Sequence, residues 1–195
     1  MKTARIEKIE NRSFELRSFE QINGDSGSHE AVGYASVFNS PTIIGDSFQE
    51  SIAPGAFAQS LANEDVRALF NHDWANVLGR VKSGTLSLEE NERGLKFSVK
   101  LPDTSTARDL AVLMERGDIN QCSFGFVPLE EDWNWDNPDL PVRTINKVKL
   151  YEVSIVSLPA YEDTEVSLSR DKFGDARNID LRKQIIKTLE DLKHE

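Results

Sequence analysis

The chain has 195 residues, which is enough for one domain with a real hydrophobic core plus appendages. Acidic residues number 33 against 23 basic ones, and the net charge of −10 argues against a nucleic-acid binder, because neutralising phosphates needs a basic surface. One cysteine excludes an internal disulfide, and three histidines are too few for a Cys/His zinc cage, so we expect no metal and no cofactor. Apolar runs stay below the roughly 18 residues of a membrane span, so we expect a cytosolic chain with no membrane segment. The acidic net charge favours proteins or peptides as partners.

The first half of the chain has the pattern of short strands. Phe14 and Leu16 alternate with charged residues and predict a first strand, which a polar turn at 23–28 connects to a second strand at 31–38. A short helix is expected at 56–62. Further apolar segments, spaced as in a barrel or sandwich, lie at 66–70, 77–88 and 94–101.

The hydrophobic period changes to that of a helix at 105–116. Ser105 is placed to cap its start and Gly117 to end it. The residues that share one apolar face are Ala107, Leu110, Leu113 and Met114.

Strand character returns at 121–129 and 143–157, separated by an acidic, Trp-containing insertion at 130–141 that we expect to be a loop or a splayed hairpin. Its acidic residues lack the spacing of a calcium loop. We divide the chain into a domain at 1–170 and a charged amphipathic tail or helix at 171–195. The tail is expected either to act as a linker, self-cleavage segment or assembly helix, or to pack on the domain as a terminal helix.

His72 is the candidate general base. The other histidines follow a Gly/Ser turn or stand next to the end of the sequence, whereas His72 follows the apolar run Val66–Phe70 inside Asn71-His72-Asp73. Taken alone, the residue favours an ordinary, partly exposed turn histidine, and only its neighbourhood favours a catalytic one.

Ser123 is the candidate nucleophile, because strand alternation puts it with Gly125 on one face and Cys122, Phe124 and Phe126 on the other. If the phenylalanines face the core, the serine points outward, and Gly125 leaves room for a substrate backbone. Serine and glycine are also common on an exposed strand face. A cysteine peptidase that uses Cys122 with His72 is a further alternative. Strand alternation argues against it, because Cys122 shares the face of Phe124 and Phe126, which we expect to be buried.

Glu152 lies in the last long strand, where the alternation puts it in an apolar row with Val148, Leu150, Ser154 and Val156. A carboxylate there needs a partner. A histidine that it orients would be one, as in a nucleophile–base–acid triad, and a salt bridge to Arg143 or to a nearby lysine would be another.

Taken together, these motifs resemble the prohead (capsid maturation) serine proteases of tailed phages, whose fold is similar to that of the herpesvirus assemblins. The resemblance covers roughly 31–168, and an ordered set is more specific than any one motif. The matching segments begin at Gly33-Tyr34-Ala35-Ser36-Val37-Phe38, Ile52-Ala53-Pro54-Gly55-Ala56-Phe57, Leu69-Phe70-Asn71-His72-Asp73 and Leu78-Gly79-Arg80. They continue with Leu101-Pro102-Asp103-Thr104, Arg116-Gly117-Asp118, Ser123-Phe124-Gly125-Phe126, Glu152-Val153-Ser154-Ile155-Val156 and Pro159-Ala160.

The resemblance implies an α+β, β-rich fold, a distorted and mostly antiparallel β-barrel with flanking helices. It implies a catalytic triad of His72, Ser123 and Glu152. The implied function is a serine endopeptidase that cleaves the scaffolding segment of the capsid precursor, and itself, inside the immature capsid in the host bacterial cytoplasm. Self-association stays open. The alternative is a catalytically silent capsid-assembly or scaffold-binding module of the same fold.

Overall fold

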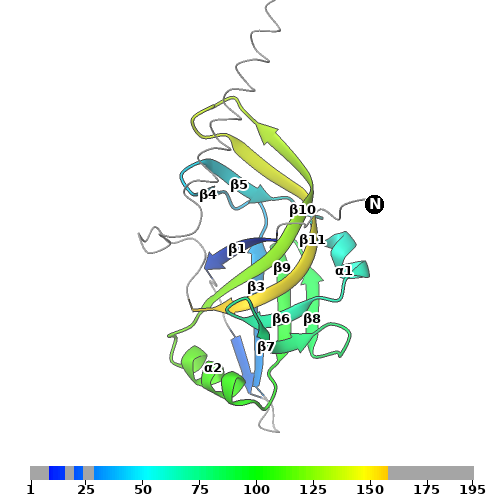
Figure 1. Ribbon diagram of the computed structural model, residues 1–195, viewed down its shortest axis with the longest axis vertical. Coiled ribbons are helices and arrows are strands. Elements are labelled where there is room, and N and C mark those ends of the chain that lie inside the picture. Colours follow the sequence, from blue (N-terminus) through cyan, green and yellow to red (C-terminus); the bar gives the residue numbers. More distant parts are fainter. Residues whose placement is uncertain (1–8, 16–19, 24–28, 158–195) are drawn as a thin grey trace, which may run out of the picture. The chain divides into compact units, whose positions relative to one another are not determined.

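The computed structural model describes residues 9–15, 20–23 and 29–157, which contain eleven strands and two helices (Figure 1). The helices are α1 (Ala58–Asn63) and α2 (Ser105–Glu115). The strands are β1 (Glu10–Glu15), β2 (Glu20–Asn23), β3 (His29–Val37), β4 (Thr42–Ile44), β5 (Phe48–Ile52), β6 (Arg67–Phe70), β7 (Asp73–Arg80), β8 (Leu86–Glu90), β9 (Gly94–Lys100), β10 (Gln121–Asn134) and β11 (Val142–Val156). The predicted tail and its boundary lie outside the described residues.

The strands form two sheets. A seven-stranded sheet has the order β1-β10-β11-β5-β4, with β6 beside β11 and β7 beside β6, and a four-stranded sheet has the order β2-β3-β9-β8. Pairing is antiparallel except where β11 meets β5 and β6. The β-rich fold with few helices is as predicted. The barrel is not confirmed, because the ladders of the described residues form two open sheets.

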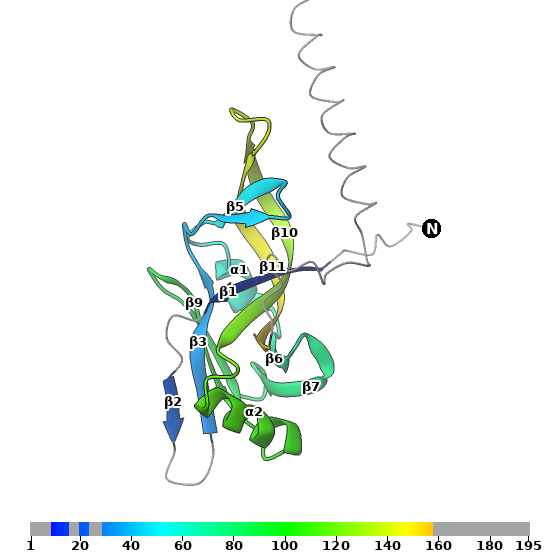
Figure 2. The same ribbon diagram turned by 90° about the vertical axis from the view of Figure 1, so that its left-hand side faces the viewer.

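The long hairpin of β10 and β11 is the spine of the larger sheet. β1 pairs with the first half of β10, while β5 pairs with the first residues of β11 and β6 with its last ones. The expected first strand therefore exists as β1, but its partner is β10, and the hairpin partner of β3 is β2. Figure 2 shows the far end of the β10–β11 hairpin extending beyond β5.

A bulge in β11 decides which side chains reach each face of this hairpin. Gly125 pairs with Glu152 but Phe126 pairs with Leu150, so Tyr151 is an extra residue without a partner on β10. A bulge of this kind turns the following side chains to the opposite face. Leu150 therefore stays in the core and Glu152 does not share its face, which makes the predicted apolar row wrong.

The core lies between the two sheets and includes residues of both. From β10 it takes Cys122, Phe124 and Phe126, each at most 1% exposed, and from β9 it takes Leu95, Phe97 and Val99. Phe124 packs edge-on against Phe57, with ring centroids 5.4 Å apart. Helix α2 adds Ala107, Leu110 and Met114, as its period predicted.

The ends of α2 are fixed by local sequence. Thr104, and not Ser105, is the N-cap, since its hydroxyl accepts the Ala107 N–H at 3.3 Å. Gly117 ends the helix with φ of +79°, a conformation that glycine adopts without steric cost, and its N–H donates to Met114 O. The predicted helix is thus confirmed with its cap moved by one residue.

The acidic insertion is the end of the β10–β11 hairpin. Ladder pairing continues as far as Asn134 with Val142, so the strand runs beyond the predicted end at residue 129. Trp133 packs against Phe48 of β5 with centroids 5.1 Å apart and stacks on Trp135 at 5.3 Å. These contacts give an otherwise acidic segment a partner surface on β5.

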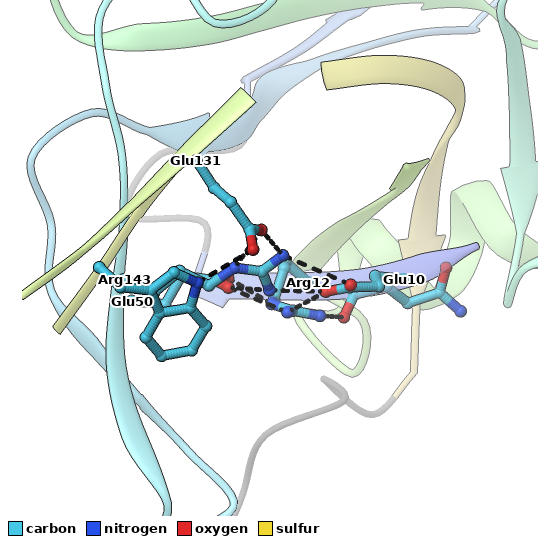
Figure 3. A network of polar contacts seen from close by, with 7 residues as sticks. Glu10, Arg12, Glu50, Glu131 and Arg143 are labelled. Atoms are coloured by element: carbon cyan, nitrogen blue, oxygen red, sulfur yellow. Dashed lines mark hydrogen bonds and ion pairs between the residues drawn. The ribbon is translucent and has the colours of Figure 1, made fainter. Parts of the chain in front are cut away.

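Five charged residues from four strands form an ionic network, with Arg12, Glu50 and Arg143 buried at its centre (Figure 3). The Glu50 carboxylate, 3% exposed, accepts hydrogen bonds from both Arg12 and Arg143, and Arg143 also pairs with Glu10 and Glu131. The network joins β1 to β5, β10 and β11, and the Arg12 guanidinium also lies 5.4 Å from the Phe126 ring centroid.

The pKa of Glu10 is lowered in this network. Burial raises its pKa, but the hydrogen bond from Arg143 and the charges of both arginines outweigh that effect and lower the pKa below the ordinary glutamate value. A lowered folded-state pKa stabilises the fold above the unfolded pKa. That contribution is lost as the pH falls through the folded value.

Replacing Glu50 with Gln is expected to lower the free energy of unfolding by about 2–3 kcal/mol, because it removes the buried carboxylate that both arginines share, while each arginine keeps an ion pair with Glu10. The measurement is urea unfolding followed by tryptophan fluorescence. Glu130→Gln is the control, since Glu130 pairs with Lys147 at the surface and its loss should cost about 1 kcal/mol or less. Equal losses in the two variants would contradict a stabilising role of the network.

Candidate active site

His72 lies in the two-residue turn between β6 and β7. Phe70 pairs with Asp73, and both residues between them, Asn71 and His72, have positive φ of 53° and 58°. Positive φ at both central positions is what a type I′ hairpin turn requires, and asparagine and histidine tolerate it better than most residues do. The turn explains how a histidine at the end of a buried strand becomes accessible.

The turn is held against the end of β11 by several hydrogen bonds. Asn71 donates its N–H to Ile155 O at 2.9 Å, and its side-chain oxygen accepts the Ser157 N–H at 2.8 Å and the Ser157 hydroxyl at 3.2 Å. The His72 N–H donates to Ser154 Oγ at 3.2 Å. The backbone of the turn is thus anchored to β11 as well as to the β6–β7 ladder.

The imidazole of His72 and the carboxylate of Glu152 form a direct pair. Nδ1 lies 2.8 Å from Oε1, with the histidine side chain 25% exposed and the glutamate 3% exposed. A carboxylate accepts here, so Nδ1 carries the proton, and in the neutral ring Nε2 is then the acceptor. This is the tautomer that a general base needs.

Ser123 lies on the same sheet face, because its partner across the ladder is Ser154, two residues after Glu152. The prediction that it points outward to solvent is wrong: the side is opposite to that of the phenylalanines, but Ser123 is 0% exposed. Strand β1 pairs with β10 at this level, and the Ser123 hydroxyl donates to Arg12 O at 3.0 Å. Its proton is therefore directed at β1 in this structure.

Gly125 shares this face, and the space beside it is filled. A Cβ at Gly125 would collide with Glu152 Oε1 and come within 3.0 Å of Asn11 Oδ1. The room left by the missing side chain holds the carboxylate, whereas the sequence suggested room for substrate.

The structure pairs His72 of the β6–β7 turn with Glu152 of β11, and it places Ser123 of β10 on the same sheet face, across the ladder from Ser154. Arg143 binds the ionic network and not Glu152, so the alternative salt bridge between Arg143 and Glu152 is wrong. The catalytic roles of His72, Ser123 and Glu152 stay predictions.

Cys122 is poorly suited to be a nucleophile. It lies 0% exposed in the core, and burial raises the pKa of its thiol well above the ordinary range. The thiolate that would attack a carbonyl is therefore disfavoured.

Sequence reasoning missed the role of Ser154, which binds both members of the His72–Glu152 pair. Its hydroxyl donates to Glu152 Oε2 at 2.5 Å and accepts the His72 N–H. The available signal was its place two residues after a candidate acid in one strand, which puts both side chains on one face.

The described ranges contain neither a metal-binding cluster nor a membrane-spanning helix. No cluster of three or more His, Cys, Asp or Glu side chains suited to a metal ion occurs among them. None of the helices described there has the length and apolar character needed to cross a bilayer.

The sequence and the fold are similar to those of phage proteases. The chain is 33% identical over 160 residues to the prohead protease of Enterobacteria phage HK97, covering 79% of this chain and 66% of that protein. It is 28% identical over 106 residues to the prohead protease of Escherichia phage T5, covering 54% of this chain and 47% of that protein. The match thus spans about two thirds and about half of these relatives.

The solved structure of the bacteriophage T4 capsid assembly protease gp21 resembles the fold, with a TM-score of 0.56 and 11% identity over 78% of this chain and 98% of that one. At this identity the likeness concerns the fold alone. The sequence signature of the caudovirus prohead serine proteases matches residues 12–178. The chain belongs to the caudovirus prohead serine protease family.

Proposed function

We propose that this chain is a serine endopeptidase that cleaves the scaffolding segment of a phage capsid precursor, and itself, during maturation of the prohead. The observation that carries the proposal is the His72–Glu152 pair, with Nδ1 and Oε1 2.8 Å apart, on the same sheet face as Ser123. Cleavage takes place inside the immature capsid, in the host bacterial cytoplasm. Family membership supports the reaction class, while the substrate and the triad are part of the proposal.

In the proposed reaction Ser123 attacks a peptide carbonyl. Its proton passes from Oγ to Nε2 of His72, and Glu152 holds Nδ1–H and stabilises the imidazolium that forms. The imidazolium then protonates the leaving amine, which leaves an acyl-enzyme on Ser123. Water attacks this ester with His72 again taking the proton, so that acid is released and the serine hydroxyl is restored.

The reaction requires the Ser123 hydroxyl to turn from Arg12 O to Nε2 of His72, because in this structure it donates its hydrogen bond to Arg12 O. That observation also favours a second function, a catalytically silent module that binds the scaffold or assists assembly. In such a module β1 would cover Ser123 permanently. The two functions differ in whether Ser123 reacts with an electrophile.

Ser123→Ala is expected to reduce cleavage of the capsid precursor by roughly 10⁴- to 10⁶-fold, as removal of single triad members does elsewhere. Cys122→Ser should keep most of the rate, because that thiol is buried in the core on the other face. The measurement is the mass of precursor and protease over time after mixing the full-length proteins.

A fluorophosphonate probe, which labels reactive serines, completes the comparison. Labelling of the wild type that disappears in Ser123→Ala supports the protease. Neither cleavage nor labelling in the wild type would establish the silent module, and cleavage by a folded Ser123→Ala protein would exclude Ser123 as the nucleophile.

Gly125→Ala is expected to keep the fold but to abolish most cleavage, because its methyl group takes the place of Glu152 Oε1. Relief of the clash should cost about 1–3 kcal/mol of stability. The measurements are the cleavage rate and urea unfolding.

A double-mutant cycle with Glu152→Gln provides the control for this prediction. If Gly125→Ala acts by displacing the carboxylate, it should have little further effect on cleavage once that carboxylate is gone. Two independent, multiplying losses would show that Gly125 acts by another route.

A further inference from the structure

Ser154 is buried between the two residues of the His72–Glu152 pair. It is 2% exposed, and its side-chain oxygen makes two hydrogen bonds. It donates to Glu152 Oε2 at 2.5 Å and accepts the backbone N–H of His72 at 3.2 Å. One hydroxyl thus binds the carboxylate through its proton and the histidine through a lone pair.

The first bond fixes the carboxylate. Glu152 Oε1 accepts Nδ1–H of His72, and without a donor at Oε2 the carboxylate would be held at one oxygen only. The terminal torsion of a glutamate is broad, so one bond does not define its plane. Ser154 holds the second oxygen and leaves Oε1 directed at the imidazole.

The second bond fixes the backbone of the turn. Asn71 and His72 both have positive φ, which most residues adopt only at a cost in free energy. The Asn71 N–H is satisfied by Ile155 O, and the His72 N–H is satisfied by Ser154. The histidine is therefore held at its backbone by Ser154 and at its ring by the carboxylate that Ser154 orients.

We propose that Ser154 is a positioning residue that fixes His72 in the tautomer and orientation needed to take a proton at Nε2. This inference rests on the proposed function, in which His72 is the general base. We assign Ser154 this role and not that of nucleophile, because both of its hydrogen bonds are made to the His72–Glu152 pair. By holding Oε2, the Ser154 hydroxyl keeps Oε1 of Glu152 directed at Nδ1 of His72.

Ser60 offers a matched control within the same fold. It too is 2% exposed, donates from its hydroxyl to Val148 O at 2.8 Å and accepts the Leu150 N–H at 2.9 Å. Ser60→Ala therefore removes a buried hydroxyl with one donated and one accepted bond, away from His72. Any effect of losing such a hydroxyl on stability alone should be common to Ser60→Ala and Ser154→Ala.

The first experiment compares cleavage of the capsid precursor by full-length Ser154→Ala and Ser60→Ala. Ser154→Ala should lower kcat by up to about 100-fold with little change in KM, since misplacing a catalytic group affects the chemical step. Ser60→Ala should shift the urea midpoint but keep kcat. Ser154→Thr, which retains a hydroxyl, should recover most of the rate.

The second experiment does not depend on activity. The chain has three histidines, so imidazole nitrogen resonances of the labelled full-length protein can be assigned by single substitutions. The wild type and Ser60→Ala should show neutral His72 protonated at Nδ1, and Ser154→Ala should show a mixture of both tautomers.

The outcomes separate the two proposals. A Ser154→Ala protein with wild-type kcat, or with His72 still fixed as the Nδ1–H tautomer, overturns the positioning role. A wild type that neither cleaves the precursor nor labels with the fluorophosphonate overturns the proposed function, and the tautomer measurement still decides on Ser154. Equal losses of kcat in Ser154→Ala and Ser60→Ala would also overturn the positioning role of Ser154, because the loss would then come from lower stability.

Discussion

The pairing of Gly125 with Glu152 across the bulge at Tyr151 is the constraint on which the rest of the site depends. An uninterrupted ladder would leave Glu152 on the same face as Leu150, inside the core. The extra residue turns Glu152 to the other face, where Gly125 leaves the space that its carboxylate fills. Ser154 follows on that face and meets the turn that holds His72. The bulge at Tyr151 thus puts Glu152 and Ser154 on the sheet face opposite to that of Leu150.

One face of the β10–β11 hairpin packs in the core and the other holds the candidate site, and β1 contacts both. The Arg12 side chain joins the ionic network and lies near the Phe126 ring (Figure 3). The Arg12 carbonyl accepts a hydrogen bond from the Ser123 hydroxyl, which belongs to the other face. Anchoring the guanidinium therefore also fixes the position of the strand beside the serine. A strand at the sheet edge without such an anchor would be easily displaced.

Sequence patterns predicted much of this arrangement because they depend on local periodicity. Alternation placed Cys122, Phe124 and Phe126 in the core and Ser123 opposite them, and the helical period located α2. The same rule failed for Leu150 and Glu152, since a bulge leaves no clear mark in residue type. The burial of Ser123 was equally out of reach, because it comes from β1, more than 100 positions away along the chain.

The turn at Asn71 and His72 shows a further limit. Hairpin turns with two positive φ values are usually recognised by glycine, and here histidine occupies the second position. The hydrogen bonds that stabilise it come from β11, so the local sequence alone contains only half of the reason for its conformation. The apolar run before it located the candidate base, and long-range contacts determine its tautomer.

The contact between Ser123 and Arg12 joins residues 111 positions apart, and the pair of His72 and Glu152 joins residues 80 positions apart. During synthesis the ribosome makes β1 long before its partner β10, and Glu152 comes after both Ser123 and His72. A growing chain therefore has neither the acid nor the strand pairing of the site until translation has passed β11. Such non-local pairing is slow to form, because distant segments must meet before any contact compensates the lost entropy. Ribosome-bound fragments of this protein that end before β11 thus lack both the His72–Glu152 pair and the complete β10–β11 hairpin.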